Sequence, residues 1–522
     1  MKKILKTKHI CLFCLLIVYL ATRMIGLLSI PIFLDEALHI EMGKIVMSGN
    51  PYVGARLGKC LSIQFYGFVL EVLGDSLFFA RLIPVVLGLL TVSVLFALGQ
   101  TGGGRKRTVP AVFGSLLYVL VPYSLFYDRL ALTDQFLTVL LAFIFLFTFR
   151  LTEKPKLLDQ VGLGAAILLS PLFKFNGLLF VPVPIIIILI IAERGERIRR
   201  LRDTSLSYSL SIPIILLFVL FATPDSEAGK LSSIRSVNAL LQLATGNAKD
   251  TFTLFWSMLT PAPFLGLVIG GMTLAMLPVQ RSSRCRIFAA AAVLIFLASP
   301  YVMLFKSWYP RYYLPLLVPL CLIGSEVSVF AMWSSGTSRR LVALSRALLF
   351  LVLTFAAANS VYLLCTPRTF PYFKGIRSQF ITGWTSGYGL QDAVETIYRL
   401  SSNYPDGIRL LRPPRWDVPL LSLDVYFREL GPHTQRITLR SWKPDIIDSQ
   451  LFEMLSDGKP TYLLFNSAYP YFDDQKMIRK ILIGFGVREL AHFVKPDASP
   501  GLRLWRLDRK SDRIGYNTLK SN

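Results

Sequence analysis

Two adjacent carboxylates, Asp35 and Glu36, follow the first long apolar stretch of the chain. That stretch, about 10–32, is interrupted mainly by Arg23 and is long enough to cross a bilayer as a helix. Charged groups at a membrane boundary cost little where water reaches them, so the pair is a candidate site at the mouth of a membrane protein. A carboxylate there would serve as a general base. The alternative is structural, because acids also stabilise a helix N-terminus.

Further polar side chains interrupt apolar stretches, and the topology expected below places them on the same side as Asp35. They are Arg81, Arg129, Asp134, Lys174, Arg311 and the neighbouring Tyr312. Considered alone, each charged residue could be a side chain at the membrane interface whose charged end reaches water. Taken together, they would line one wet cavity that holds both carboxylates and cations.

This combination of carboxylates and cations suits the transfer of a sugar from a lipid phosphate. Lysine and arginine would bind the phosphate and stabilise it as it leaves, and we assign this role to Lys174, with Arg81 and Arg311 as helpers. A carboxylate would take the proton from the attacking hydroxyl or amine. We assign that role to Asp35, with Asp134 orienting the acceptor or a cation. Attack opposite the phosphate needs one base and inverts configuration, whereas retention would need a nucleophilic carboxylate.

Glu36 is a further catalytic candidate, but it should not share the role of Asp35. Neighbouring residues on a helix point about 100° apart. We also count Arg129 and Tyr312 among the residues that bind the donor phosphate or substrate; Arg129 lies in the same expected turn as Asp134, and Tyr312 follows Arg311. If a divalent metal ion takes part, Asp35, Glu36 and Asp134 would supply oxygen ligands. The same acids also suit base catalysis without a metal.

The composition is that of a polytopic helical membrane protein. Of its 522 residues, 53% are hydrophobic, and the mean hydropathy is +0.53. The net charge of +24 does not indicate a nucleic-acid partner, because much of the basic excess lies in short loops between apolar stretches. Membrane lipids with anionic headgroups are the expected electrostatic partner.

The basic loops predict the topology. We expect eleven spans, near 10–30, 77–99, 109–126, 132–150, 159–174, 177–192, 205–222, 252–278, 287–305, 312–332 and 342–363. Loops rich in lysine and arginine follow the second, fourth, sixth, eighth and tenth spans. All of them lie inside if the N-terminus is cytoplasmic, and the tail after Leu363 then lies outside, at the cell membrane.

Two domains are expected: a transmembrane domain over 1–363 and an extracytoplasmic α/β domain over 364–522. The first outer loop, about 31–76, carries helical patterns at 35–46 and 62–73, which we expect to lie along the membrane surface. In the second domain, 408–411 and 462–465 look like buried strands. Helical patterns at 391–400, 451–455 and 475–483 alternate with them.

Ordered short motifs give the chain a family resemblance. They are Leu34-Asp35-Glu36, Ala80-Arg81-Leu82-Ile83-Pro84, Arg129-Leu130-Ala131-Leu132-Thr133-Asp134, Lys174-Phe175-Asn176-Gly177-Leu178 and Pro310-Arg311-Tyr312-Tyr313-Leu314-Pro315. In their order and sidedness they resemble the GT-C membrane glycosyltransferases, and most closely the protein O-mannosyltransferase and aminoarabinose (lipid A) transferase group. The resemblance covers about the first 330 residues, and the tail is similar only in being a soluble outer domain.

The resemblance implies roles for particular residues. Asp35 would be the catalytic base and Asp134 a second acid, while Arg81 and Lys174 match positions of the active cavity and donor phosphate. Lys59 falls where the aminoarabinose transferases have a lysine followed by two prolines, but Cys60-Leu61 stand in the place of those prolines. This departure weakens any claim to lipid A as acceptor.

The family also implies a donor. Its members use a polyprenyl-phosphate sugar that is made on the cytoplasmic side and flipped outward, so this chain would do the same. The acceptor would be a lipid, a glycan or a protein.

Two other functions stay open at this point. A secondary transporter would use charges within the membrane to bind substrate and ions, but it predicts structural repeats and helices broken near the midplane. We find no clear repeat, and the charges lie at the outer edge. A non-enzymatic envelope scaffold would use the outer domain to bind a partner.

Overall fold

The computed structural model describes residues 2–102, 107–222, 281–303, 309–333, 339–412, 420–441, 458–467, 485–499 and 501–509. The span expected near 252–278 and the helices expected at 451–455 and 475–483 lie outside these residues. The chain forms two compact units. The first comprises Met1–Leu27, Met42–Val72 and Ala80–Phe373, and the second comprises Leu28–Glu41, Leu73–Phe79 and Lys374–Asn522.

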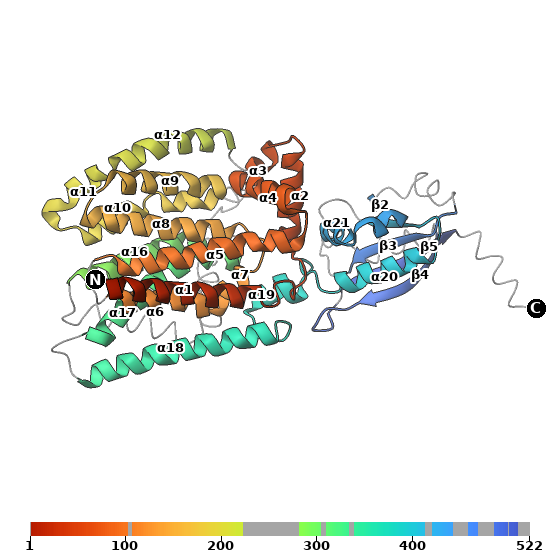
Figure 1. Cartoon of the computed structure of the whole chain (residues 1–522). Helices are drawn as coiled ribbons and strands as arrows, with labels where there is room; N and C mark the ends of the chain where they lie inside the picture. Colours follow the sequence, from red (N-terminus) through yellow and green to blue (C-terminus); the bar gives the residue numbers. More distant parts are fainter. Residues whose placement is uncertain are drawn as a thin grey trace, which may run out of the picture. The chain divides into compact units, whose positions relative to one another are not determined.

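The first unit is helical (Figure 1). Within the described residues, six helical stretches are long and apolar enough to cross a membrane: Thr7–Met24, Leu77–Gln100, Asp134–Glu153, Ser283–Pro300, Pro310–Val329 and Val342–Cys365. They belong to α1 (Lys2–Met24), α5 (Leu77–Gln100), α8 (Asp134–Glu153), α16 (Arg281–Met303), η4 (Pro310–Leu316) with α17 (Leu317–Trp333), and α18 (Arg339–Cys365). The chain is therefore an integral membrane protein, as its composition predicts.

Other expected spans form shorter helices. They are α9 (Leu157–Phe173), η2 (Phe175–Phe180) with α10 (Val183–Ile191), and α12 (Ser205–Ala222), while α11 (Arg197–Asp203) lies in the basic loop before α12. The stretch near 109–126 is divided into α6 (Thr108–Leu120) and α7 (Pro122–Tyr127). Proline has no N–H for a helical hydrogen bond, so the helix breaks at Val121, whose backbone is extended. The count of eleven spans stays a prediction.

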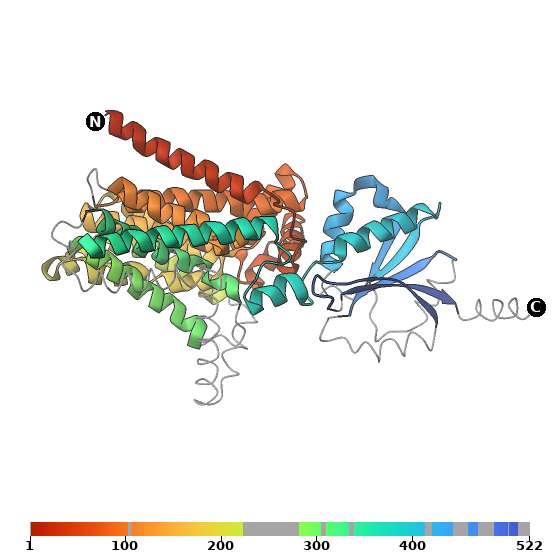
Figure 2. The same cartoon turned by 90° about the horizontal axis from the view of Figure 1, so that it is seen from below.

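The N-terminal part of α1 has the surface of a lipid-facing helix. Figure 2 shows this helix diverging from its neighbours toward its N-terminus. The side chains of Ile10 and Phe13 are 60% and 65% exposed. Such apolar exposure fits hydrocarbon rather than water.

The first outer loop contains both expected surface helices, as α2 (Leu34–Met47) and α4 (Cys60–Leu73), with the short α3 (Tyr52–Arg56) between them. In α4, Phe65 and Phe68 are exposed while Tyr66 is buried.

The crossing of α2 and α4 needs glycine. A Cβ on Gly67 would lie 2.5 Å from the carbonyl oxygen of Gly43, so the two backbones are in direct contact.

Two buried ionic networks lie at opposite ends of α8. In the network near its N-terminus, Arg23 Nε lies 3.5 Å from Asp128 Oδ2, and the hydroxyls of Tyr19 and Tyr118 each donate to Asp128 over 3.0 Å. Arg23 and Asp128 are fully buried. Because each charge is enclosed with its counter-charge, the network ties α1 to α6 and to the chain that follows α7.

The second network joins α6, α8, α16 and α17. Arg286 Nη2 lies 2.7 Å from Glu153 Oε1, and Arg107 Nη1 lies 2.6 Å from Glu326 Oε1. Arg286 also lies 3.3 Å from Glu326, which is fully buried and therefore shared by two arginines. These contacts fix the C-terminal end of α8.

The second unit contains a five-stranded sheet of order β2-β1-β3-β5-β4. Its strands are β1 (Ile408–Arg412), β2 (Ile437–Ser441), β3 (Thr461–Asn466), β4 (Phe485–Phe493) and β5 (Leu502–Arg509). β1 pairs in parallel with β2 and β3, while β5 pairs antiparallel with β3 and β4. Both strands expected from the sequence are present as β1 and β3. The helices of this unit include α19 (Lys374–Arg377), α20 (Leu390–Ser402) and α21 (Leu420–Glu429).

Replacement of Asp128 by alanine should destabilise the first unit strongly. The variant leaves the buried Arg23 without its counter-charge, which typically costs about 3–5 kcal/mol. We expect a clearly lower midpoint of thermal unfolding for the purified protein in detergent.

The matched control is the double variant Arg23→Met with Asp128→Leu, which removes both charges and should recover much of the loss. An unchanged midpoint for Asp128→Ala would contradict the structural role of this pair.

Candidate functional site

Asp134, Lys174 and Arg311 form a buried charge cluster in the first unit. Asp134 begins α8, Lys174 connects α9 to η2 in extended backbone, and Arg311 lies in η4. Lys174 Nζ forms an ion pair with Asp134 Oδ1, and Arg311 Nε lies 3.8 Å from Asp134 Oδ2. The three residues are only 2%, 5% and 7% exposed, respectively. Three residues far apart in the sequence are thus brought together, with two cations on one carboxylate.

Aromatic rings complete the cluster. Lys174 Nζ lies 4.5 Å from the ring centroid of Tyr312, and the Arg311 guanidinium carbon lies 4.8 Å from that of Tyr309. Cation–π contacts of this kind orient a cation without neutralising it. Tyr123 donates a hydrogen bond from its hydroxyl to the carbonyl of Pro310 and so fixes the start of η4. The cluster therefore presents two oriented positive charges, which suits the binding of a phosphate.

The loop that carries Lys59 lies against the loop of Lys174. The N–H of Phe175 donates to the carbonyl of Gly58 over 2.8 Å, and Ser62 Oγ donates to the carbonyl of Phe173 over 2.8 Å. Lys59 itself is half-buried. These hydrogen bonds hold both sides of Lys174 at the start of α4.

Two of these supporting residues escaped the sequence analysis. Besides Ser62, Tyr66 donates from its hydroxyl to the carbonyl of Leu132 over 3.1 Å, close in sequence to Asp134. Both are buried, whereas Phe65 and Phe68 of the same helix are exposed. Polar residues four positions apart on the buried face of an apolar helix are the signal that would have found them.

Arg81 and Arg129 bind the chain at the end of α1. Arg81 Nη1 donates to the carbonyl of Leu27 over 2.8 Å, and Arg129 Nη2 donates to the carbonyls of Ile25, over 2.9 Å, and Gly26. Carbonyls just past a helix C-terminus carry partial negative charge, so cations are favoured there. Burial lowers the pKa of Arg129 to about 10, and repulsion by Arg81 and Arg23 adds to this effect. These contacts give both arginines a structural role.

In the second unit, Asp35 and Glu36 lie in the first turn of α2. Glu36 is fully buried, and its Oε2 accepts a hydrogen bond from the N–H of Phe33 over 2.9 Å. This is the geometry of a carboxylate that caps a helix N-terminus. Stabilisation of a helix N-terminus, the structural alternative for the acidic pair, is therefore the role of Glu36. Asp35, by contrast, is half-buried.

Residues of the C-terminal part of the chain hold the segment before Asp35. The N–H of Ile32 donates to the hydroxyl of Tyr426 over 3.1 Å, and the N–H of Leu34 donates to the carbonyl of Thr385 over 3.2 Å. The rings of Phe33 and Phe380 have centroids 4.2 Å apart. From the sequence alone this segment is expected to belong to the first outer loop of the membrane domain, and nothing in its own residues indicates these partners.

Among the residues that the structure describes, no group of three or more histidines, cysteines or acids is placed to hold a metal ion. Asp134 is instead engaged by Lys174 and Arg311.

Comparisons with known proteins support the same interpretation of the fold. Residues 64–222 match the model of a family described as dolichyl-phosphate-mannose-protein mannosyltransferase. Two solved structures of ArnT from Cupriavidus metallidurans, one bound to undecaprenyl phosphate and one in the apo state, each match over 95% of this chain and 97% of their own. Their TM-scores are 0.55 and 0.52, at sequence identities of 16% and 14%. A comparison with curated proteins gave no significant match. The resemblance to the GT-C glycosyltransferases of the mannosyltransferase and aminoarabinose transferase group, first drawn from short motifs, is thereby confirmed.

Proposed function

We propose that this protein is an inverting glycosyltransferase that moves a sugar from a polyprenyl-phosphate donor to an acceptor on the outer face of the membrane. The observation that carries the proposal is the buried cluster of Asp134, Lys174 and Arg311. The three side chains together carry one net positive charge, which the negative charge of a lipid phosphate would complement.

The cluster suggests how the donor is handled. Lys174 and Arg311 bind the phosphate and stabilise its growing negative charge as the bond to the sugar breaks. Asp134 keeps both cations paired before the donor arrives, so no isolated charge is buried. Arg81 and Arg129, which were expected at the phosphate, contribute mainly by holding the end of α1.

Asp35 is the proposed base. It takes the proton from the acceptor hydroxyl or amine as that atom attacks the anomeric carbon opposite the phosphate. A single base is enough for this inverting displacement. Glu36 caps the helix and thereby fixes the backbone that carries Asp35.

The donor class is supported by likeness of fold. One of the similar ArnT structures is bound to undecaprenyl phosphate, a polyprenyl phosphate. We propose a lipid, a glycan or a protein as acceptor. From the basic loops we propose that the N-terminus lies in the cytoplasm and the C-terminal unit outside, at the cell membrane.

Transfer itself is the first test. Membranes that contain the protein should move radiolabelled sugar from a polyprenyl phosphate to an endogenous acceptor, and membranes without it should not. Transport of the labelled compound without transfer would favour a transporter. If the membranes show neither transfer nor transport, a non-enzymatic scaffold is favoured.

The variant Lys174→Ala should weaken donor binding and slow departure of the phosphate. Removing one partner of a buried, hydrogen-bonded charge pair costs roughly 2–5 kcal/mol, so kcat/KM for the donor should fall at least about 30-fold. Steady-state kinetics on purified protein check this, with the exposed Arg194→Ala as the charge-matched control. If Lys174→Ala keeps both kcat and KM, the phosphate assignment fails.

The variant Asp35→Asn should lower turnover by about 10²–10⁴-fold at saturating donor, because the amide cannot accept the proton. Its folding should be near normal. Glu36→Gln keeps an oxygen that accepts the capping hydrogen bond and should lower turnover less, whereas Glu36→Ala should lower stability by about 0.5–2 kcal/mol, as loss of a cap does.

Transfer rates on matched amounts of folded protein decide between these roles. Turnover close to wild type in Asp35→Asn would rule out Asp35 as the base.

The topology predicts where a reporter fused after Lys520 is active. An outer location follows from the basic loops on the N-terminal side of the membrane. A periplasmic or extracellular reporter should therefore be active there. Activity of a cytoplasmic reporter alone would reverse the proposed orientation.

A further inference from the structure

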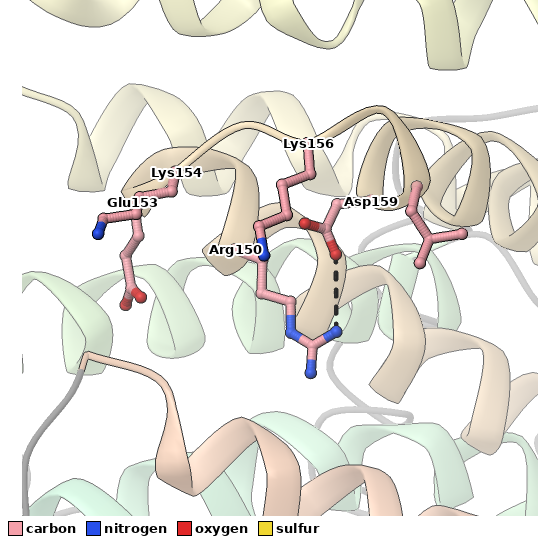
Figure 3. Close-up of a pocket in the computed structure, with 6 residues that line it drawn as sticks. Arg150, Glu153, Lys154, Lys156 and Asp159 are labelled. Atoms are coloured by element: carbon pink, nitrogen blue, oxygen red, sulfur yellow. Dashed lines mark ion pairs between the residues drawn. The ribbon is translucent and has the colours of Figure 1, made fainter.

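A cavity of about 490 Å³ lies where α8 ends and α9 begins (Figure 3). Its lining residues are Arg150, Glu153, Lys154, Lys156, Leu158 and Asp159. The helix α8 has 20 residues, so at about 1.5 Å per residue its two ends are about 30 Å apart. That distance matches the hydrocarbon thickness of a bilayer, so in the proposed topology the cavity lies at the membrane surface opposite the Asp134 cluster.

The acids that line this cavity are already neutralised. Arg150 Nη1 lies 3.6 Å from Asp159 Oδ1, the ion pair drawn in Figure 3, and Glu153 pairs with Arg286 over 2.7 Å. Lys154 and Lys156 are both exposed. Within the part of the chain that the structure describes, neither lysine forms an ion pair. The cavity therefore carries excess positive charge.

The start of α9 adds to this charge. Lys156 is the N-cap residue, and its side chain makes no capping hydrogen bond. The helix dipole favours negative charge at this end, where the carboxylate of Asp159 lies in the first turn. Two lysines and a helix N-terminus thus line one cavity.

Exposed leucines beside the lysines favour a lipid over a soluble anion. Leu157 and Leu158 are 67% and 77% exposed, and Leu158 lines the cavity. A free phosphate would leave these side chains in water. The acyl chains of a lipid would cover them while its headgroup phosphate meets the lysines.

We propose that this cavity binds the phosphate headgroup of an anionic phospholipid. In the proposed topology the lipid belongs to the cytoplasmic leaflet. The site is separate from the charge cluster of Asp134 and does not depend on the proposed function.

Native mass spectrometry of the full-length protein in detergent tests the proposal. The protein is titrated with phosphatidylglycerol and, in parallel, with phosphatidylcholine of the same acyl chains. The wild type should bind phosphatidylglycerol more tightly. The double variant Lys154→Gln with Lys156→Gln should weaken that binding by about 10-fold to 30-fold, the effect of removing two cations at an anionic surface.

The charge-matched control is Arg194→Gln with Arg202→Gln, which removes two exposed arginines outside the cavity. It should keep the affinity, and Lys154→Arg with Lys156→Arg should keep most of it. If the lysine and control variants lose affinity for phosphatidylglycerol equally, the effect comes from overall surface charge and the proposed site is wrong. Competition by millimolar inorganic phosphate would show a soluble anion site instead and overturn the lipid assignment.

Discussion

The sharing of one carboxylate by two buried cations is the constraint on which the proposed site depends. Taking a lysine and an arginine out of water is costly unless an anion accompanies them, and Asp134 supplies that anion. The three side chains together carry one net positive charge. In the proposed function, the phosphate of a lipid donor at the membrane edge complements that charge.

The surrounding structure serves to fix that cluster. Ser62 and the Gly58 carbonyl hold the residues on either side of Lys174, and Tyr66 holds the chain before Asp134. α4 can do this while crossing α2 because Gly43 and Gly67 let the backbones touch. Before Asp134 in the sequence, the fully buried ion pair of Arg23 and Asp128 anchors the turn that leads into α8.

Much of this was predictable from the sequence, and the exceptions have physical causes. Apolar length locates α5 and α8, and helical spacing locates α2 and α4, because burial imposes those patterns. Charges within apolar stretches pointed to Asp134, Lys174 and Arg311, since a membrane protein keeps such charges only where they are paired or wet. Sequence spacing cannot say which charges pair, so the structural contacts of Arg81 and Arg129 with the end of α1 were not foreseen. Nor could it show that Tyr426 and Thr385 hold the segment before Asp35, because these contacts join residues hundreds of positions apart.

The most direct test of the central claim is an experimental structure of this protein with a polyprenyl-phosphate sugar bound. The phosphate oxygens should lie within hydrogen-bonding distance, about 3 Å, of Lys174 Nζ and the Arg311 guanidinium. Their contacts with Asp134 should then be loosened or shared with the phosphate. A phosphate bound elsewhere, with the three side chains still paired as in the free protein, would contradict the account.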